Sequence, residues 1–425
     1  MKILILDSAP TSTTHSGKAL RLIHILQRLG RRHELHFAGI VGPDDPETVP
    51  AWLRGLVAST RIWRRREAEF ALGRYVNWLT LQPWFYAPWR YPDDYKTLSH
   101  QVREAVRHEE FDLVHCFDEE VAQFIPDALP CPWVADPADA MALHAMRRSQ
   151  QASGMAQRWR WGLMARRLAC YEHQLVGRAD ATVFVSPVDA AGYLNNGTRR
   201  RVQVIPNGVD TEYFSATENG TGSLFAIATD KMRTGTIFHA PALLFTGHMS
   251  FEPNRDAAMA LIDDVLPRVR AQVPEAVCYI VGADPTADLT DRHDGRHVFV
   301  TGRVDDLRPY FAQASVYVCP MRLGAGIKNK LLEAMAMGCP IVTTRRGAEG
   351  LDVQDGTHVR LADTPEAIAD GVLSLLRHPA EAAALRHAAR AYVVERHSWD
   401  RVAETYEALY RLLVDSPETV VRSSS

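Results

Sequence analysis

The segment GAGIKNKLLE, which begins at Gly324, combines residue types that can bind an anion. Its two glycines let the backbone approach a ligand closely, and Lys328 and Lys330 supply positive charge that suits a phosphate. The residues that follow predict a helix, whose first N–H groups and positive dipole end would add to this attraction. Glu333, one turn into that helix, can accept two hydrogen bonds from a vicinal diol. These parts fit a nucleoside diphosphate, with its phosphates at the helix end and its ribose on Glu333.

A plainer alternative is a strand–helix loop in which Lys330 and Glu333 form a surface pair at i, i+3. The chain has 48 basic residues, of which only six are lysines. Two of these six lie within five residues of Glu333, which favours the functional interpretation.

Composition excludes several classes of protein. The net charge of −3 argues against general nucleic-acid binding, which needs a strongly basic face. The six cysteines are scattered without a CxxC pair, so we expect reduced thiols rather than disulfides or a zinc site. The first apolar run is too short for a signal peptide, and no run approaches the roughly 20 apolar residues of a spanning helix. We therefore expect a cytoplasmic protein, with a peripheral position on the inner face of the cytoplasmic membrane as an option.

Short, nearly all-apolar runs recur between helix-length segments, as is typical of strands buried on both faces of a parallel sheet. The runs cover residues 2–6, 34–39, 111–117, 132–136, 181–186 and 201–206, then 242–247, 276–283, 297–302, 315–320, 340–344 and 357–361. They predict an α/β protein with two tandem, doubly wound Rossmann-like domains. Ligands bind at the carboxyl ends of parallel strands, so two such domains facing each other would enclose a binding cleft.

The predicted boundaries follow from changes in composition. We expect an N-terminal domain at 1–214, a polar linker or insertion at 215–240, a C-terminal domain at 241–396, a closing helix at 397–415 and a disordered tail at 416–425.

The segment that begins at Gly324 resembles the nucleotide-sugar-binding motif of the retaining GT-B glycosyltransferases of family 4. In that motif a Glu, seven residues and a second Glu are followed by AMA.G.P.V. Glu333 matches the second Glu, and Ala325 occupies the place of the first, which in the family contacts the donor sugar. The form GI.NK..EAMAMG resembles a subgroup of sugar transferases linked to exopolysaccharide and exosortase (PEP-CTERM) gene clusters. IPNGVDTEYF, from Ile205, is similar to the segment that ends the family's first domain, and HSWDRVAETYEALYRLL, from His397, resembles its closing helix.

The resemblance implies transfer of a sugar from a nucleoside diphosphate sugar to a hydroxyl of a glycan or lipid-linked acceptor, in exopolysaccharide or other cell-surface glycan assembly. Lys328, Lys330 and the helix end would stabilise the leaving diphosphate. No metal or other cofactor is expected, and the sequence has no Asp-x-Asp signature. Asp136 stands where many members carry a His in the cleft near the donor sugar, so it is a catalytic candidate with the two lysines. Asp136 followed by Pro137 is equally suited to capping a helix.

The resemblance places the other donor contacts in five segments. We expect these contacts at Gly17, Lys18 and Arg21 near the first strand, at Asn207 in IPNGVD, at Gly247 and His248, at Arg303 and Val304, and at Gly324, Ala325, Gly326, Ile327, Asn329 and Glu349. His248 replaces an Arg that contacts the pyrophosphate, and no Lys follows it, so Lys328 and Lys330 could supply that charge. Glu349 could partly replace the missing first Glu. For the residues near the first strand, an ordinary helix start is an equally good explanation.

Two segments combine tryptophan with arginine. Residues 61–91 are rich in aromatics, and residues 147–168 hold six arginines, two tryptophans and no acid. Such segments suit an anionic membrane surface or an acceptor carried on a lipid. Their alternative role is ordinary packing under helices of the first domain, with the arginines in solvent.

Two other functions are compatible with the sequence. A GT-B nucleotide-sugar 2-epimerase is disfavoured by the NGVD and closing-helix matches. A non-catalytic protein that binds nucleotide sugars is compatible with Ala325 and Asp136 at the two altered positions.

Overall fold

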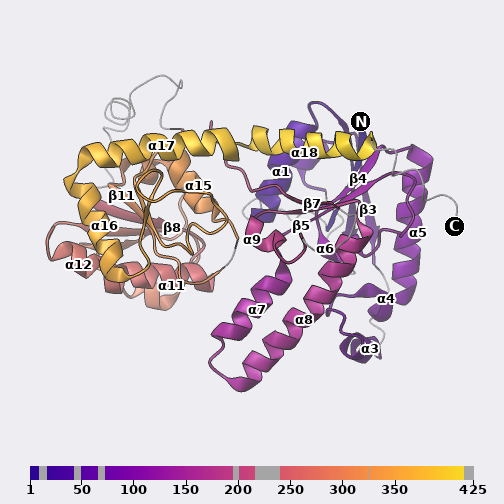
Figure 1. Cartoon of the computed structure of the whole chain (residues 1–425), viewed down its shortest axis with the longest axis horizontal. Coiled ribbons are helices and arrows are strands. Elements are labelled where there is room, and N and C mark those ends of the chain that lie inside the picture. Colours follow the sequence, from indigo (N-terminus) through magenta and orange to yellow (C-terminus); the bar gives the residue numbers. More distant parts are fainter. Residues whose placement is uncertain are drawn as a thin grey trace. The chain divides into compact units, whose positions relative to one another are not determined.

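The computed structural model describes residues 1–8, 17–42, 49–65, 72–194, 201–215, 240–324 and 326–415. The chain separates into two compact units (Figure 1). The N-terminal unit holds Met1–Pro206 together with the chain from Val402 onward, and the C-terminal unit holds Asn207–Arg401. Each unit has its own parallel sheet covered by helices, which confirms the predicted α/β architecture. Most of the predicted linker, the predicted tail and Ala325 lie outside the described residues.

The N-terminal unit contains a seven-stranded parallel sheet of order β3-β2-β1-β4-β5-β6-β7. Its strands are β1 (Lys2–Ser8), β2 (Glu34–Val41), β3 (Ser59–Arg64), β4 (Leu113–Cys116), β5 (Trp133–Ala138), β6 (Ala181–Phe184) and β7 (Arg201–Val204). Its helices are α1 (Gly17–Leu29), α2 (Ala51–Arg54), α3 (Gly73–Leu79), α4 (Ala87–Arg90), α5 (Pro92–Glu109), α6 (Glu119–Ala122), α7 (Met141–Gln151), α8 (Met155–Arg178) and α9 (Pro187–Ala190). β1 and β4 lie inside the sheet and are almost wholly buried, which explains their apolar sequences.

The C-terminal unit contains a six-stranded parallel sheet of order β10-β9-β8-β11-β12-β13. Its strands are β8 (Ala242–Thr246), β9 (Val277–Val281), β10 (Val298–Val300), β11 (Val316–Cys319), β12 (Ile341–Thr343) and β13 (Arg360–Leu361). Its helical segments are α11 (Glu252–Ala260), the π-helical turn η1 (Leu261–Val265), α12 (Leu266–Arg270), α13 (Ala287–Thr290), α14 (Arg308–Gln313), α15 (Asn329–Ala336), α16 (Pro365–Arg377) and α17 (Pro379–His397). The strand order reverses between β8 and β11, and such a switch point is where ligands bind in doubly wound sheets.

The last helix, α18 (Trp399–Val414), begins in the C-terminal unit and continues in the N-terminal one. Tyr406 and Tyr410 on this helix are fully buried. Their hydroxyl groups bond to side chains of the N-terminal sheet, so α18 is an integral part of that unit's core.

Candidate functional site

The loop between β11 and α15 requires glycine at two places. The backbones of Gly324 (φ +92°) and Gly326 (φ +72°) have positive φ angles, which residues other than glycine rarely adopt. α15 begins at Asn329, and no side chain in the described part of the chain caps its amino end. The Leu331 N–H already donates to the Lys328 carbonyl oxygen at 2.8 Å. An anion would therefore meet the N–H groups of Asn329 and Lys330, which come first in this helix, and this role stays a prediction. Ile327 in the same loop is buried and belongs to the core.

The two lysines of this segment lie in different surroundings. Lys328 is buried, and its Nζ donates to the Gly326 carbonyl oxygen at 2.6 Å. The Lys330 Nζ donates to Oδ1 of Asn254 and lies 4.7 Å from the centre of the Phe245 ring. Burial lowers the pKa of Lys330 to about 8. Asn254 was not predicted, because nothing near it in the sequence marks a partner 76 residues away.

The side chain of Glu333 lies one turn into α15. In the described part of the chain no hydrogen bond or ion pair reaches its side chain, so the proposed Lys330–Glu333 surface pair does not form. Burial raises the pKa of Glu333 to about 7, although Lys330 acts in the opposite direction at longer range. A half-buried, unbonded acceptor one turn into α15 is suited to receive hydroxyl groups of a ligand.

Two further predicted residues, Asn207 and Gly247, lie near this helix. Asn207 Nδ2 donates to Asn329 Oδ1 at 3.2 Å, which brings the IPNGVD segment to the start of α15. A Cβ at Gly247 would lie 2.8 Å from Lys330 Nζ, so the absence of a side chain there makes room for the ammonium group. The glycine at position 208 has a packing reason, because a Cβ there would lie 2.6 Å from the Trp399 ring.

The remaining predicted residues of this unit lie in different surroundings. His248 is exposed, and its Nε2 lies 2.9 Å from the Asp284 carboxylate. Arg303 is exposed after β10, whereas Val304 packs against the core. Glu349 follows β12 and pairs with Arg346 at 3.0 Å. Their predicted donor contacts stay predictions.

Asp136 lies in β5 and is 1% exposed. The cap interpretation is wrong, because β5 continues to Ala138 and α7 starts only after Ala140. Arg21 Nη2 lies 3.4 Å from the Asp136 carboxylate, which also accepts a hydrogen bond from Tyr406. Burial alone would raise the pKa of Asp136, but Arg21, His115 and Tyr406 outweigh it and lower that pKa to about 2. The carboxylate is enclosed by protein groups, so its predicted catalytic role stays a prediction.

Gly17 and Lys18 open α1. The Lys18 ammonium lies 3.0 Å from the Asp7 carboxylate and also pairs with Asp118. Burial raises the pKa of Asp7 to about 6 in spite of this lysine. Arg21, one turn further, is 2% exposed and donates to the carbonyl oxygens of residues 205 and 206. Both cations already have protein partners.

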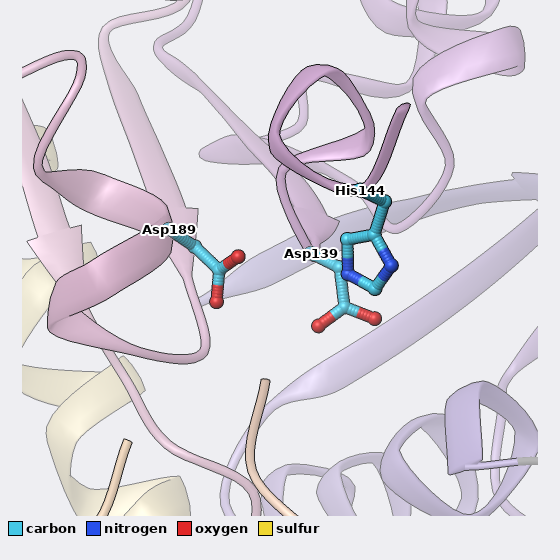
Figure 2. A group of neighbouring side chains, drawn as sticks. All are labelled: Asp139, His144 and Asp189. Atoms are coloured by element: carbon cyan, nitrogen blue, oxygen red, sulfur yellow. The ribbon is translucent and has the colours of Figure 1, made fainter. Parts of the chain in front are cut away.

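Asp139, His144 and Asp189 form a separate cluster in the N-terminal unit. Figure 2 shows the first two side chains next to each other and the Asp189 carboxylate turned toward them. Their ligand atoms lie within 4.8 Å of one another, so the group could hold a metal ion. The expectation of no metal therefore stays a prediction, and this group is the place to test it.

Two family models match the chain. Residues 17–213 match the model described as Glycosyltransferase Family 4, and residues 240–378 match the one described as Glycosyl transferases group 1. The first match lies mostly in the N-terminal unit, and the second lies within the C-terminal unit. They support the predicted resemblance to GT-B glycosyltransferases of the family 4 type.

The curated relatives that the chain matches include glycosyltransferases with 27% to 30% sequence identity. A GDP-mannose-dependent alpha-(1-6)-phosphatidylinositol monomannoside mannosyltransferase of Mycolicibacterium smegmatis is 27% identical over 52% of this chain and 59% of its own length. A phosphatidyl-myo-inositol mannosyltransferase of Mycobacterium leprae is 30% identical over 51% of this chain and 55% of its own length. The chain thus spans less than two thirds of the length of these relatives.

Solved structures share the fold along nearly the whole chain. The sucrose-phosphate synthase of Thermosynechococcus elongatus superposes with a TM-score of 0.67 at 17% identity, covering 98% of this chain and 100% of its own. Anabaena HepE in complex with UDP superposes with a TM-score of 0.64 at 14% identity, covering 97% of this chain and 100% of its own. These superpositions confirm the GT-B type of fold.

Proposed function

We propose, from the two glycosyltransferase family matches and the geometry around α15, that this protein transfers a sugar from a nucleoside diphosphate sugar to a hydroxyl group with retention of anomeric configuration. The observation that carries the proposal is the unbonded Glu333 carboxylate one turn from the Lys330 ammonium, at the switch point of a parallel sheet. One group suits a ribose diol and the other a diphosphate. The subgroup resemblance makes exopolysaccharide or another cell-surface glycan the proposed product.

The resemblance to the retaining glycosyltransferases of family 4 implies the following chemistry. The bond between the anomeric carbon and the donor phosphate breaks, a bond to the acceptor oxygen forms on the same face, and the acceptor's proton passes to the leaving phosphate. The Lys330 ammonium and the backbone N–H groups of Asn329 and Lys330, at the start of α15, stabilise the negative charge that develops on that phosphate. Such preorganised donors act strongly because they are partly shielded from water.

The first experiment identifies the nucleoside base of the donor. The names of related proteins mention GDP-mannose in one case and UDP in another, so both bases enter a screen with ADP-sugars. A ligand at about 100 times its Kd contributes about 2.7 kcal/mol of stability, which shifts Tm by several degrees. We expect one base class to raise Tm. Equal Tm values with all three classes and without ligand would contradict a nucleotide-sugar site.

Turnover should survive EDTA, because Lys330 and the helix end supply the charge that a metal would otherwise provide. The measurement is release of the nucleoside diphosphate before and after chelation. Asp189→Asn serves as a companion variant, since it removes the negative charge of one carboxylate of the cluster in Figure 2. Loss of turnover on chelation, with recovery on adding Mg²⁺ or Mn²⁺, would contradict this account of leaving-group stabilisation.

The proposed lipid-linked acceptor directs attention to α7 and α8, which pack side by side as a helical hairpin (Figure 1). Met155 and Trp159 on α8 are 87% and 67% exposed. Exposed arginines lie on the same two helices at 148, 158, 160 and 166, and no acidic residue occurs between 141 and 171. Trp161, by contrast, packs beside Phe85 and Tyr171, so only part of this segment is core. No helix in the described part of the chain is long and apolar enough to cross a membrane.

We expect the Arg158/Arg160/Arg166→Gln variant to bind anionic liposomes about 100-fold more weakly than the unaltered protein. Each arginine near an anionic surface contributes about 1 kcal/mol, and three give about 3 kcal/mol. Co-sedimentation at low and high salt measures the effect, which must weaken with salt.

The matched control replaces three exposed arginines elsewhere in the same unit, Arg31, Arg103 and Arg107, by glutamine. This change alters the net charge equally but leaves α8 intact. Equal loss of binding in both variants would show that total charge acts rather than this surface. Absence of binding by the unaltered protein would refute the membrane contact.

A further inference from the structure

The sequence presents Lys328 and Lys330 as equivalent charges, but the structure separates them. Lys328 precedes α15, and its ammonium turns back to a carbonyl of its own loop. Lys330 lies in the first turn of α15 and extends to the end of β8, where Asn254 receives it. The Lys328 ammonium therefore bonds within its own loop, whereas the Lys330 ammonium lies at the switch point of the sheet.

The Asn254 side chain is held in one orientation by a hydrogen bond that does not involve Lys330. It lies in the first turn of α11 and is 7% exposed. Its Nδ2 donates to the His248 carbonyl oxygen at 2.9 Å. This bond orients the amide, so Oδ1 is the atom that faces Lys330.

The Lys330 ammonium is closely surrounded by other groups of the protein. A Cβ at Gly247 would lie 2.8 Å from Lys330 Nζ and 2.9 Å from Asn254 Nδ2, so any side chain there would displace the ammonium. The Phe245 ring faces the same nitrogen. The titratable groups that act on Lys330 are Cys319, Glu333 and Lys328.

We propose that Asn254 is a positioning residue that holds the Lys330 ammonium at the end of β8, and that Lys330, rather than Lys328, receives the donor diphosphate. An ammonium group has three N–H donors. Asn254 takes one of them, which leaves donors for phosphate oxygens while the nitrogen stays in place. The assignment of Lys330 to the diphosphate rests on the proposed function, whereas the positioning role of Asn254 does not.

The test uses the chain's small number of lysines. Competitive labelling with acetic anhydride, followed by peptide mass spectrometry, measures the reactivity of Lys330, Lys328 and exposed Lys96 separately across pH. Burial lowers the pKa of Lys330, so its reactivity should rise near pH 8. Asn254→Asp places a negative charge beside the ammonium and should move this midpoint upward by about one to three pH units. Gly247→Ala, which keeps Asn254, should also move the midpoint, because the ammonium is displaced.

Inorganic pyrophosphate is the probe for the diphosphate, since it needs no knowledge of base or sugar. We expect saturating pyrophosphate to protect Lys330 and to leave Lys328 and Lys96 unchanged. A midpoint for Lys330 that is the same in the unaltered protein and both variants would overturn the positioning role. Protection of Lys328 without protection of Lys330, or protection of neither, would overturn the assignment of the diphosphate. If instead Lys330 is protected but no nucleotide sugar is turned over, the inference stands and the proposed transferase activity fails.

Discussion

Lys330→Met is expected to lower kcat by about 10²- to 10³-fold, because removal of one preorganised donor to a developing negative charge has effects of this size. Methionine keeps much of the length of the side chain and can still pack against Phe245, so the change removes charge more than volume. The measurement is initial rate against donor concentration, with the donor that gives the largest thermal shift.

Lys96→Met is the matched control, since Lys96 is an exposed lysine in the other unit. Its kcat should equal that of the unaltered protein. Near-normal kcat in Lys330→Met would remove this lysine from the chemical step, whatever its effect on affinity.

Glu333→Gln is expected to weaken binding of the nucleoside diphosphate by about 1 to 3 kcal/mol, which is about 5- to 150-fold. The Glu333 carboxylate accepts no hydrogen bond from the residues that the structure describes, so its oxygens are available to the ribose hydroxyls. Glutamine retains the shape but loses the charge and one acceptor. Calorimetry with the donor and with the free nucleotide measures the loss.

Pyrophosphate provides an internal control, because it has no ribose and its affinity for Glu333→Gln should not fall. Glu395→Gln, an exposed change on α17, controls for the loss of one negative charge. Unchanged affinity of Glu333→Gln for both donor and nucleotide would exclude this residue from the ribose contact.

The fold could be predicted largely from local pattern. Runs such as residues 2–6 and 242–247 are nearly all apolar, because β1 and β8 are covered on both faces. The strand β3 was missed. It lies at the edge of its sheet, where all six residues are only partly buried, so its sequence STRIWR lacks the apolar run of an inner strand.

The site was predictable only where one segment carries its parts. The loop glycines, Lys330 and Glu333 all lie within ten residues, and the structure keeps them on one loop and helix. Asp136 was different, because its ionic partner Arg21 lies 115 residues away and its hydrogen-bond donor Tyr406 lies 270 residues away. Local sequence suggested a helix cap, whereas long-range packing made a buried ion pair. The distinction between Lys328 and Lys330 likewise depends on Asn254, which no local pattern identifies.

The central claim is that the protein breaks the sugar–phosphate bond of a nucleotide sugar with retention. The most direct measurement is proton NMR of the purified protein with the α-linked nucleotide sugar that raises Tm most, without acceptor, at early times. We expect slow release of nucleoside diphosphate together with free sugar that appears first as the α anomer. Tight binding without any release would identify a non-catalytic binding protein. Release of the β anomer first, or conversion of the sugar to its 2-epimer, would contradict the claim.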